Sequence, residues 1–528
     1  MSGAPERYVL AIDLGTGAVK TALVSAHAEV VAPAAREIRT LHLPGGGAEQ
    51  DPNQWWSATC EAARETLRTA ALAPERVIAV KCTTQWAVTV PVDAGGRPLS
   101  NAISWLDGRG APHARKVAGG PLRVGGYDPR KLWRWIRLTG GAPTLTGVDG
   151  LGHTLFLRAE RPEIWAKTHR LLEPMDYLNL RLTGRFAASY GTIFPYWLTD
   201  NRDVRRIDYH PALLRMAGIE REKLPDLLPV DAVLGTLLPE VADDLGLTPA
   251  TRVLMGACDG QSAAIGAGCV GDGEAYFSIG TTSWLSCHVP KKKSDLLHLI
   301  TTMPAAIPGR YVVMAEQGVA GRCLEFVKDN LFFPRDAGPQ PDDAYATLEA
   351  EAASVPAGSH GLVFLPWLGG VAAPSDDPRT RSAFVNQTLR TTRGHYVRAV
   401  MEGVAFNLRW LRRHVERFVG RPFPQLGFVG GAALSPTWGQ VLADVLGVPV
   451  RQMAHARHAN AVGGALAAFT ALGEIRIDDV PSRVKVDAVH RPDPAAAKLY
   501  DERFADFLDL YRRMKPVYRR MNRPAQGG

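Results

Sequence analysis

Short apolar runs separated by glycine-rich turns open the chain. Apolar residues predominate at positions 8–12 and 19–24, with Asp13-Leu-Gly-Thr-Gly17 at the turn between them, and a third short run, Glu29-Val-Val31, follows. This pattern predicts an antiparallel start to a sheet. The arrangement recurs past the middle of the chain, where Ser278-Ile-Gly-Thr-Thr282 has an apolar run on either side. Such turns present backbone N–H groups and hydroxyls to an anion, so two facing turns could hold a polyphosphate.

Apolar residues at helical spacing predict the main helices. Asp51 is a candidate cap for a helix that starts at Pro52, and a strand at 77–82 follows it, which gives a mixed α/β order. In the second half, the pattern predicts an amphipathic helix over 396–418 and a strand with a glycine turn over 427–433. A helix of small residues over 461–469 would allow close backbone approach.

The segment 108–150 is rich in Gly, Pro and Arg, which predicts a long loop region or an insertion over a cleft. Trp133 and Trp135 either anchor this segment or simply pack against the domain. The sequence also predicts a basic tail beyond about residue 475.

Length and composition predict a globular protein of at least two domains. The 528 residues exceed the roughly 250–300 that one core usually supports. The six cysteines never approach C-x-x-C spacing, and the polar start lacks an apolar signal core. No stretch of about 20 uncharged apolar residues could span a bilayer. We therefore expect a cytoplasmic protein with reduced thiols and no membrane association.

The net charge of +8 comes largely from Lys291-Lys292-Lys293 and from the segment 512–523. No basic face with interleaved aromatic residues is evident, so we expect a solvated basic surface and no nucleic-acid partner.

The first glycine turn is not a known nucleotide motif by itself. Val19 precedes Lys20 where a P-loop requires glycine, a strand follows instead of a helix, and the third glycine of a dinucleotide fingerprint is missing. Taken alone, the turn could be an ordinary hairpin. Asp13, at the end of the first strand, could hold Mg²⁺ through water beside phosphates. Lys20 either meets a phosphate or faces solvent.

A second carboxylate, Asp259, lies in Gly256-Ala-Cys-Asp-Gly260 between an apolar strand and a stretch of small residues. It could cap a helix. Between two phosphate-binding turns, it could instead accept the proton of an attacking hydroxyl as a general base.

A third cluster comprises Gln85, Trp105, Asp107 and Arg109, with Trp86 beside it. These residues supply the hydrogen-bonding fork, the carboxylate and the flat apolar face that polyol recognition uses. The alternative is a structural Asp–Arg pair beside a core tryptophan.

Six segments in this order resemble the FGGY family of carbohydrate kinases, from about residue 8 to about residue 473. They are Asp13-Leu-Gly-Thr-Gly17, Trp105-Leu-Asp-Gly-Arg109, Asp176-Tyr-Leu-Asn-Leu-Arg-Leu-Thr-Gly184, Gly256-Ala-Cys-Asp-Gly260, Ser278-Ile-Gly-Thr-Thr282 and Gly430-Gly-Ala-Ala433. The resemblance implies an α/β fold of two actin-like, ribonuclease-H-like domains around a central cleft. We expect a sugar-binding domain over 1–262, an ATP-binding domain over 263–480 and a basic tail over 481–528.

The resemblance also implies roles for individual residues. Asp259 would be the base that deprotonates the sugar, and Asp13 would assist Mg²⁺. Gln85, Trp86, Trp105, Asp107 and Arg109, together with Asp259, would bind the substrate. The residues expected to contact ATP are Thr16, Gly17, Lys20, Gly280, Thr281 and Thr282 at the phosphates, and Gly430, Gly431, Ala432, Ser435 and Gln440 around adenosine.

Departures from the family pattern concern the substrate. Thr84-Gln-Trp-Ala-Val88 stands where xylulose kinases usually carry Gly-Gln-Met-His-Gly and where glycerol kinases carry Gln-Arg-Glu-Thr. Val371-Ala372 stands where many relatives have Glu-Arg. We expect ATP-dependent phosphorylation of a sugar or polyol, with a ketose such as D-xylulose the leading candidate. The alternative is a nucleotide-gated binding or scaffold protein on the same fold. A homodimer is possible.

Overall fold

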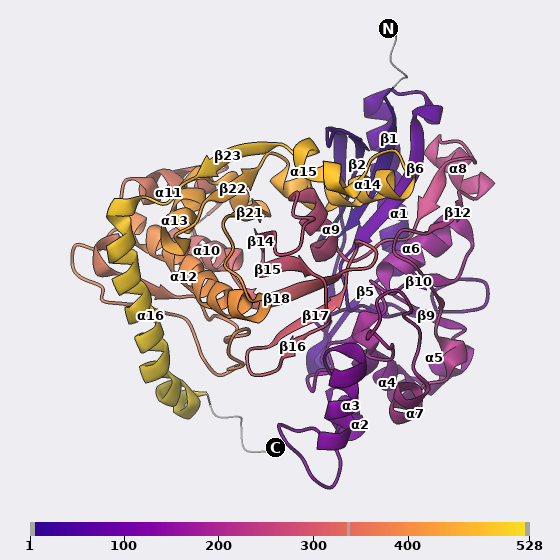
Figure 1. The fold of residues 1–528 in the computed structure, drawn as a ribbon, viewed down its shortest axis with the longest axis horizontal. Helices are drawn as coiled ribbons and strands as arrows, with labels where there is room; N and C mark the ends of the chain where they lie inside the picture. The colour runs from indigo at the N-terminus through magenta and orange to yellow at the C-terminus, as the bar shows by residue number, and fades with distance from the viewer. Residues whose placement is uncertain (1–5, 335–337, 523–528) are drawn as a thin grey trace.

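Two mixed β-sheets form the framework of the chain, and the computed structural model describes residues 6–334 and 338–522. The first sheet contains β1 (Tyr8–Leu14), β2 (Ala18–Ser25), β3 (Val30–Glu37), β6 (Val77–Thr84), β12 (Val233–Thr236) and β13 (Arg252–Leu254). The second contains β14 (Ala275–Ile279), β15 (Thr282–Val289), β16 (Ser294–Asp295), β17 (Ile300–Pro304), β18 (Tyr311–Val319), β21 (Leu426–Val429), β22 (Val450–Met453) and β23 (Val486–His490). Each sheet forms the centre of one of two lobes, which stand side by side in Figure 1.

Both predicted glycine-threonine hairpins are confirmed. β1 and β2 pair antiparallel up to Leu14 opposite Val19, and β14 and β15 pair antiparallel up to Ile279 opposite Ser283. In both cases the glycines occupy the short turn between the strands. The two turns therefore occupy equivalent positions in the two sheets.

The two sheets repeat one strand order. The first runs β12-β13-β6-β1-β2-β3, and the second runs β16-β17-β18-β15-β14-β21-β22-β23. In each, the hairpin has an antiparallel third strand on one side and two parallel strands on the other, namely β6 and β13 or β21 and β22. A duplicated order of this kind is that of two actin-like, ribonuclease-H-like domains, which confirms the predicted fold class.

Small strand pairs and helices surround the two sheets. The additional strands are β4 (Leu41–Leu43), β5 (Gly47–Gln50), β7 (Val90–Val92), β8 (Ala102–Ile103), β9 (Arg170–Leu172), β10 (Ala187–Ser189), β11 (Asp226–Leu228), β19 (Val363–Leu365) and β20 (Ala383–Val385). Helices of the first part are α1 (Pro52–Ala70), α2 (Ala111–Ala118), α3 (Pro129–Thr139), α4 (Gly150–Glu160), α5 (Pro162–Lys167), α6 (Pro174–Thr183), α7 (Pro211–Ala217), α8 (Pro239–Leu245) and α9 (Asp259–Gly266). Those of the second are α10 (Gly321–Val327), α11 (Ala344–Ala353), α12 (Arg393–Val419), α13 (Pro436–Leu446), α14 (Ala459–Ala471), α15 (Val480–Arg483) and α16 (Pro494–Met521).

Helix α1 confirms the prediction from apolar spacing and shows its cause. The Asp51 carboxylate accepts a hydrogen bond from the Asn53 amide at 2.8 Å, and Pro52 occupies the first turn. Trp55 is fully buried against the first sheet. The helices predicted over 396–418 and 461–469 are likewise confirmed as α12 and α14.

Helices α9 and α14 cross in close contact between the lobes (Figure 1). A Cβ atom on Gly463 would lie 1.8 Å from the Ser262 carbonyl oxygen, and one on Gly266 would lie 2.0 Å from that of Ala459. Only glycine permits this approach at either position. The domain boundary expected between residues 262 and 263 falls inside α9, and the first strand of the second sheet, β14, begins at Ala275.

The segment 108–150 contains two helices, so it is not one long loop, and the alternative of an insertion over a cleft stays a prediction. The two helices are α2 and α3, and Asp128 caps α3 by accepting hydrogen bonds from the amides of Arg130 and Lys131. Trp135 is fully buried, which confirms the packing interpretation for this residue, whereas Trp133 is 60% exposed and contacts the Arg137 guanidinium over its ring. The many arginines and glycines masked the helical pattern.

The described part of the basic tail expected over 481–528 is folded onto the second lobe. β23 pairs antiparallel with β22 at the edge of the second sheet. α16 buries Tyr500, Phe504 and Phe507 in the core of the second lobe. The basic residues lie on the other faces of this helix, and their charge concealed the apolar stripe in the composition.

All six cysteines are buried and form no disulfide, in agreement with their spacing. Among the described helices, none combines the length and the apolar character needed to cross a bilayer.

Candidate active site

Asp259 is the first residue of α9, immediately after the loop that follows β13. Its carboxylate accepts a hydrogen bond from the Gly260 amide at 2.7 Å. Two side chains fix this loop. The Lys81 ammonium donates to the Met255 carbonyl, and the Ser189 hydroxyl donates to the Gly256 carbonyl at 2.5 Å. This support fixes the start of α9, and with it the position of the carboxylate.

The second lobe also contacts the start of α9, at Gly260. The Tyr276 hydroxyl on β14 donates to the Gly260 carbonyl, and a Cβ atom on Gly260 would lie 2.6 Å from the Cε atom of Met314 on β18. Asp259 therefore lies where the two lobes meet.

Asp13 lies at the end of β1 and is 3% exposed. The Asn460 side-chain amide, at the start of α14, lies 3.4 Å from both Asp13 carboxylate oxygens. The Lys20 ammonium on β2 lies 3.7 Å from Oδ2 of the same carboxylate. Lys20 thus neither faces solvent alone nor forms part of a P-loop, since it pairs with the carboxylate across the hairpin.

The close crossing of α9 and α14 brings the two aspartates into one site. α9 begins with Asp259, and α14 begins one residue before Asn460, which contacts Asp13. The pKa of Asp259 is raised to about 7, first by burial and then by the nearby charge of Asp13, while Lys20 acts in the opposite direction. A carboxyl group with this pKa can accept a proton near neutral pH.

The two glycine turns leave open space in front of their backbone. A Cβ atom on Gly17 or on Gly280 would meet no heavy atom within 4 Å. The turns themselves are ordered by backbone hydrogen bonds, from Gly15 to Ala18 and from Gly280 to Thr282, both at 2.9 Å. Each turn can therefore be approached closely by a ligand.

A cavity of about 350 Å³ begins at the second turn and extends into the second lobe. Its lining residues are Ile279, Gly280, Thr281, Gly321, Arg322, Leu324, Glu325, Tyr345, Glu349, Met401, Gly431, Ala432, Leu434, Ser435, Trp438 and Arg457. Five of the residues expected to bind nucleotide are in this set: Gly280, Thr281, Gly431, Ala432 and Ser435. The cavity has the size and the mixed apolar and polar lining of a small-molecule site.

Besides Thr16, Gly17 and Lys20 of the first lobe, three residues of the second lobe that were expected at the nucleotide do not line the cavity. Gln440 donates to the Asp444 carboxylate at 2.7 Å and to the Arg491 carbonyl at 2.8 Å. Gly430 packs behind the turn, where a Cβ atom would lie 2.6 Å from the Ile279 carbonyl oxygen. The Thr282 hydroxyl accepts a hydrogen bond from the Trp284 indole at 3.1 Å, and Thr282 lies on the strand that leaves the turn.

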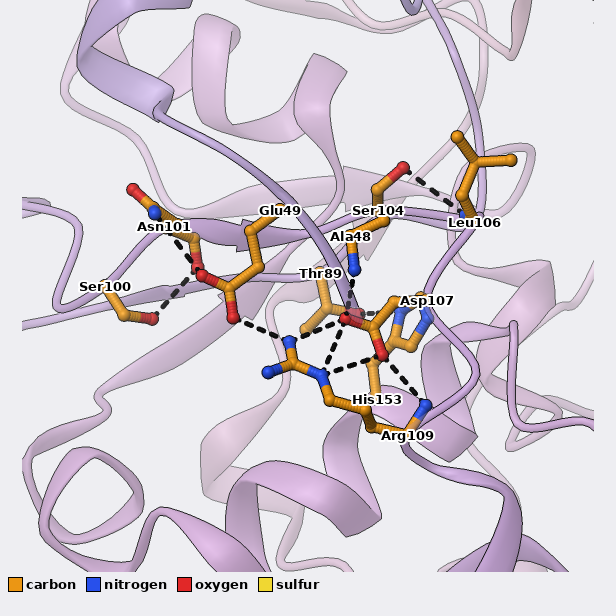
Figure 2. Close-up of polar contacts among 10 residues, drawn as sticks. All are labelled: Ala48, Glu49, Thr89, Ser100, Asn101, Ser104, Leu106, Asp107, Arg109 and His153. Atoms are coloured by element: carbon orange, nitrogen blue, oxygen red, sulfur yellow. Dashed lines mark hydrogen bonds and ion pairs between the residues drawn. The ribbon is translucent and has the colours of Figure 1, made fainter. Parts of the chain in front are cut away.

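Asp107 and Arg109 form a closed network (Figure 2). The Arg109 guanidinium binds both Asp107 carboxylate oxygens at 2.6–3.1 Å and donates to Glu49 at 2.6 Å. Asp107 is fully buried and also accepts from the Ala48 amide at 2.9 Å. This geometry favours the alternative of a structural Asp–Arg pair, because the Asp107 carboxylate already has its hydrogen-bond partners within the protein.

Gln85 and Trp105 lie next to the first glycine turn. Trp105 donates from its indole to the Thr16 hydroxyl at 3.1 Å. The Gln50 amide donates to the Thr16 carbonyl at 2.8 Å, and the Gln85 amide donates to the Gln50 oxygen at 2.7 Å. The carbonyl oxygen of the Gln85 side chain is buried and has no partner within the described chain. The predicted substrate residues Gln85 and Trp105 therefore support the turn that contains Thr16 and Gly17.

Trp86 contributes to an apolar wall formed by both lobes. It stacks on Phe194 with 5.9 Å between ring centroids and donates to the Thr192 carbonyl at 3.1 Å. Met314 and Trp284 of the second lobe pack in the same cluster. The side of the site next to Gly260 is consequently apolar.

Comparison with known proteins assigns the family. The sequence model of the N-terminal domain of the FGGY family of carbohydrate kinases matches residues 8–131 and 136–266, and that of the C-terminal domain matches residues 275–472. The chain belongs to the FGGY family of carbohydrate kinases. It is therefore an ATP-dependent carbohydrate kinase, and this assignment favours the kinase over the scaffold alternative.

Individual relatives of this FGGY kinase carry different names. A xylulose kinase of Staphylococcus epidermidis is 27% identical, and the match covers 97% of this chain and 98% of the relative. An autoinducer-2 kinase of Klebsiella pneumoniae is 28% identical, over 96% of this chain and 93% of the relative. The crystal structure of xylulose kinase from Rhodospirillum rubrum is similar with a TM-score of 0.82 and 26% identity, over 97% of this chain and 100% of that chain.

Several residues of the FGGY kinase site escaped prediction from the sequence. Asn460 lies far from Asp13 in sequence, and Lys81 reads as an ordinary polar interruption of a buried strand. Arg322 and Arg457 line the cavity but belong to no motif. The only usable signal was the small-residue pattern of α14, which predicted a close helix contact without naming its partner.

Proposed function

We propose that this FGGY kinase transfers the γ-phosphoryl group of ATP to a hydroxyl of a sugar or polyol, with Asp259 as the general base. The observation that carries the proposal is the position of Asp259 between the lobes with a pKa of about 7. The carboxylate would take the proton of the attacking hydroxyl, and the protein would otherwise act by positioning and by stabilising charge.

ATP would occupy the cavity of the second lobe. Adenosine would lie toward Tyr345, Ser435 and Trp438, and the phosphates would extend past the second glycine turn toward the first. The open space in front of Gly17 and Gly280 supports this path, because the backbone there can be approached without displacing a side chain. Thr16 and Thr281 would contribute hydroxyls.

A magnesium ion carried by the nucleotide fits the residues present. Within the described chain, no group of three or more His, Cys, Asp or Glu side chains could hold a metal without help. Mg²⁺ is usually bound by one or two carboxylates, waters and substrate phosphates, and Asp13 supplies one buried carboxylate. When bound, the ion would neutralise charge on the phosphates. Asn460 and Lys20 would orient Asp13 beside it.

The acceptor would be a ketose or polyol, with D-xylulose the leading candidate. The relatives named xylulose kinase support this class, while Trp86 and Ala87 replace the polar side chains that such enzymes usually present. The apolar wall of Trp86, Phe194 and Trp284 would contact carbon atoms of the acceptor, and the buried oxygen of Gln85 could accept from one of its hydroxyls. The Arg109 guanidinium is already paired with Asp107 and Glu49, so we assign it no contact with the acceptor.

A screen of ADP release over pentuloses, hexuloses, alditols and glycerol tests this proposal. We expect turnover with at least one acceptor and its loss in Asp259→Asn, with ATP binding largely kept. The matched control is Asp231→Asn, a change at a carboxylate on the loop below Lys81, which should retain turnover. Near-full activity of Asp259→Asn on the true acceptor would exclude this residue as the base.

A further inference from the structure

Two arginines that belong to no family motif line the nucleotide cavity. Arg322 lies in the first turn of α10, and Arg457 lies in a short 3-10 helix, η9 (Ala456–His458), just before α14. Both are exposed. Within residues 6–334 and 338–522, neither guanidinium forms an ion pair or a hydrogen bond. Two uncompensated cations in one concave site favour an anionic ligand.

The carboxylates in the same cavity do not neutralise these arginines. Glu349 accepts hydrogen bonds from the Ser435 hydroxyl at 2.7 Å and the Thr437 amide at 3.1 Å. Glu325 lies on α10 three residues after Arg322 but forms no ion pair with it. The positive charge at Arg322 and Arg457 therefore remains available.

The backbone next to each arginine contacts a glycine turn of the second lobe. The Gly321 amide, next to Arg322, donates to the Gly280 carbonyl of the second glycine turn at 2.9 Å. The Ala456 carbonyl, next to Arg457, accepts from the Gly430 amide at 3.1 Å. Three residues beyond Arg457, Asn460 contacts Asp13 of the first lobe.

The electrostatic environment links Arg457 to Asp13. Burial is the main cause that lowers the pKa of His458, which follows Arg457. The charges of Lys20, His455 and Arg457 lower this pKa further, while the charge of Asp13 raises it. These charges are therefore close to one another. Lys20 and Arg457 are thus cations near His458, whose own imidazole is neutral near pH 7.

We propose that Arg322 and Arg457 bind the phosphates of the nucleotide beyond the first, in addition to the backbone of the two glycine turns. This inference rests on the proposed function and identifies two residues for donor binding that the motifs do not contain. A guanidinium offers paired N–H donors that match two phosphate oxygens, which an ammonium group cannot reproduce.

Calorimetric titration with adenylyl imidodiphosphate, a non-transferring triphosphate, and with AMP tests the proposal. In Arg322→Met and in Arg457→Met we expect the affinity for the triphosphate to fall about tenfold or more, as for loss of a charge-assisted hydrogen bond. Affinity for AMP should change less than about threefold by the same reasoning. Arg457→Lys should give an intermediate loss.

Arg252→Met is the matched control, since Arg252 is also exposed and unpaired within the described chain but lies on β13 of the first sheet. Because neither cavity arginine has a partner to lose, melting temperatures without nucleotide should equal that of the wild type. An unchanged ratio of triphosphate to AMP affinity in both variants, in an enzyme that still phosphorylates its acceptor, would overturn this inference alone. A wild type that binds neither nucleotide would overturn the proposed function as well.

Discussion

The Asn460 side-chain amide lies 3.4 Å from both carboxylate oxygens of Asp13, although the two residues are 447 positions apart. Asp13 ends the first strand of one lobe, and Asn460 begins the helix that crosses α9 between the lobes. The orientation of the buried carboxylate is thus coupled to the packing of the helix pair that also positions Asp259. This coupling makes Asn460 a positioning residue for the proposed reaction.

Replacement of Asn460 by alanine should lower kcat about tenfold, because one hydrogen bond to a charged group is lost and Asp13 can turn toward Lys20. KM for the acceptor should change little. Steady-state kinetics with varied Mg²⁺ measures the effect, and a higher Mg²⁺ requirement is expected. Asn330→Ala, which removes an exposed amide bonded to the Phe326 carbonyl, is the control. Equal kcat in the two variants would contradict the coupling.

Helix α16 should be an integral part of the second lobe. Phe507 is fully buried and packs with 5.2 Å between its ring centroid and that of Trp367. Phe507→Ala should therefore destabilise the protein by about 3–5 kcal/mol, as for other buried aromatic truncations. Urea denaturation measures the change. Met521→Ala, at a side chain that is 74% exposed, should leave stability unchanged. If both variants unfolded alike, α16 would be dispensable.

The fold could be predicted from the sequence because its central elements are local. The two hairpins, α1 and α12 each follow from apolar periodicity and a nearby turn or cap, and the family resemblance supplied their arrangement. The helices in the segment 108–150 and helix α16 were not recognised from the sequence, for the same reason in both cases. Arginine and lysine side chains cover the exposed faces of these helices, so composition suggested a loop region or an insertion over 108–150 and a basic tail at the C-terminal end.

The residues that line the cavity could be predicted where they belong to a glycine turn. Gly280, Thr281 and Gly431 line the cavity as expected, since their backbone geometry is encoded locally. Asp107 was ambiguous, because the sequence does not reveal that Ala48 and Arg109 already satisfy its carboxylate. Contacts between residues from different lobes, such as Asn460 with Asp13, leave no local pattern.

The close crossing of α9 and α14 should tolerate no side chain at Gly463. An added Cβ atom would lie 1.8 Å from the Ser262 carbonyl oxygen, which belongs to a helix backbone and cannot move aside cheaply. We expect Gly463→Ala to destabilise the protein by about 3 kcal/mol or more and to reduce turnover. Differential scanning calorimetry measures the first effect. Gly235→Ala, where the nearest atom would be the Cδ of Arg185 at 3.9 Å, is the control and should be near neutral.

The pH dependence of turnover should report the Asp259 carboxyl. Its pKa is raised to about 7, first by burial and then by the charge of Asp13, so the protonated form accumulates below neutral pH. A general base must be deprotonated to act, and kcat/KM should therefore fall about tenfold per pH unit below pH 7 and level off above it. The relevant measurement is the initial rate from pH 5 to 9 at low acceptor concentration.

Glu402 provides the control for this profile. It is also a buried carboxyl whose pKa burial raises, but it lies in the second lobe between Arg398 and Tyr500, away from the cleft. Conservative replacement by glutamine should therefore leave the midpoint near pH 7, whereas Asp259→Glu should shift it and Asp259→Asn should abolish the rate at every pH. A wild-type profile flat from pH 5 to 9 would show that the proton leaves the acceptor by another route, because no carboxyl with this pKa could remain active when protonated.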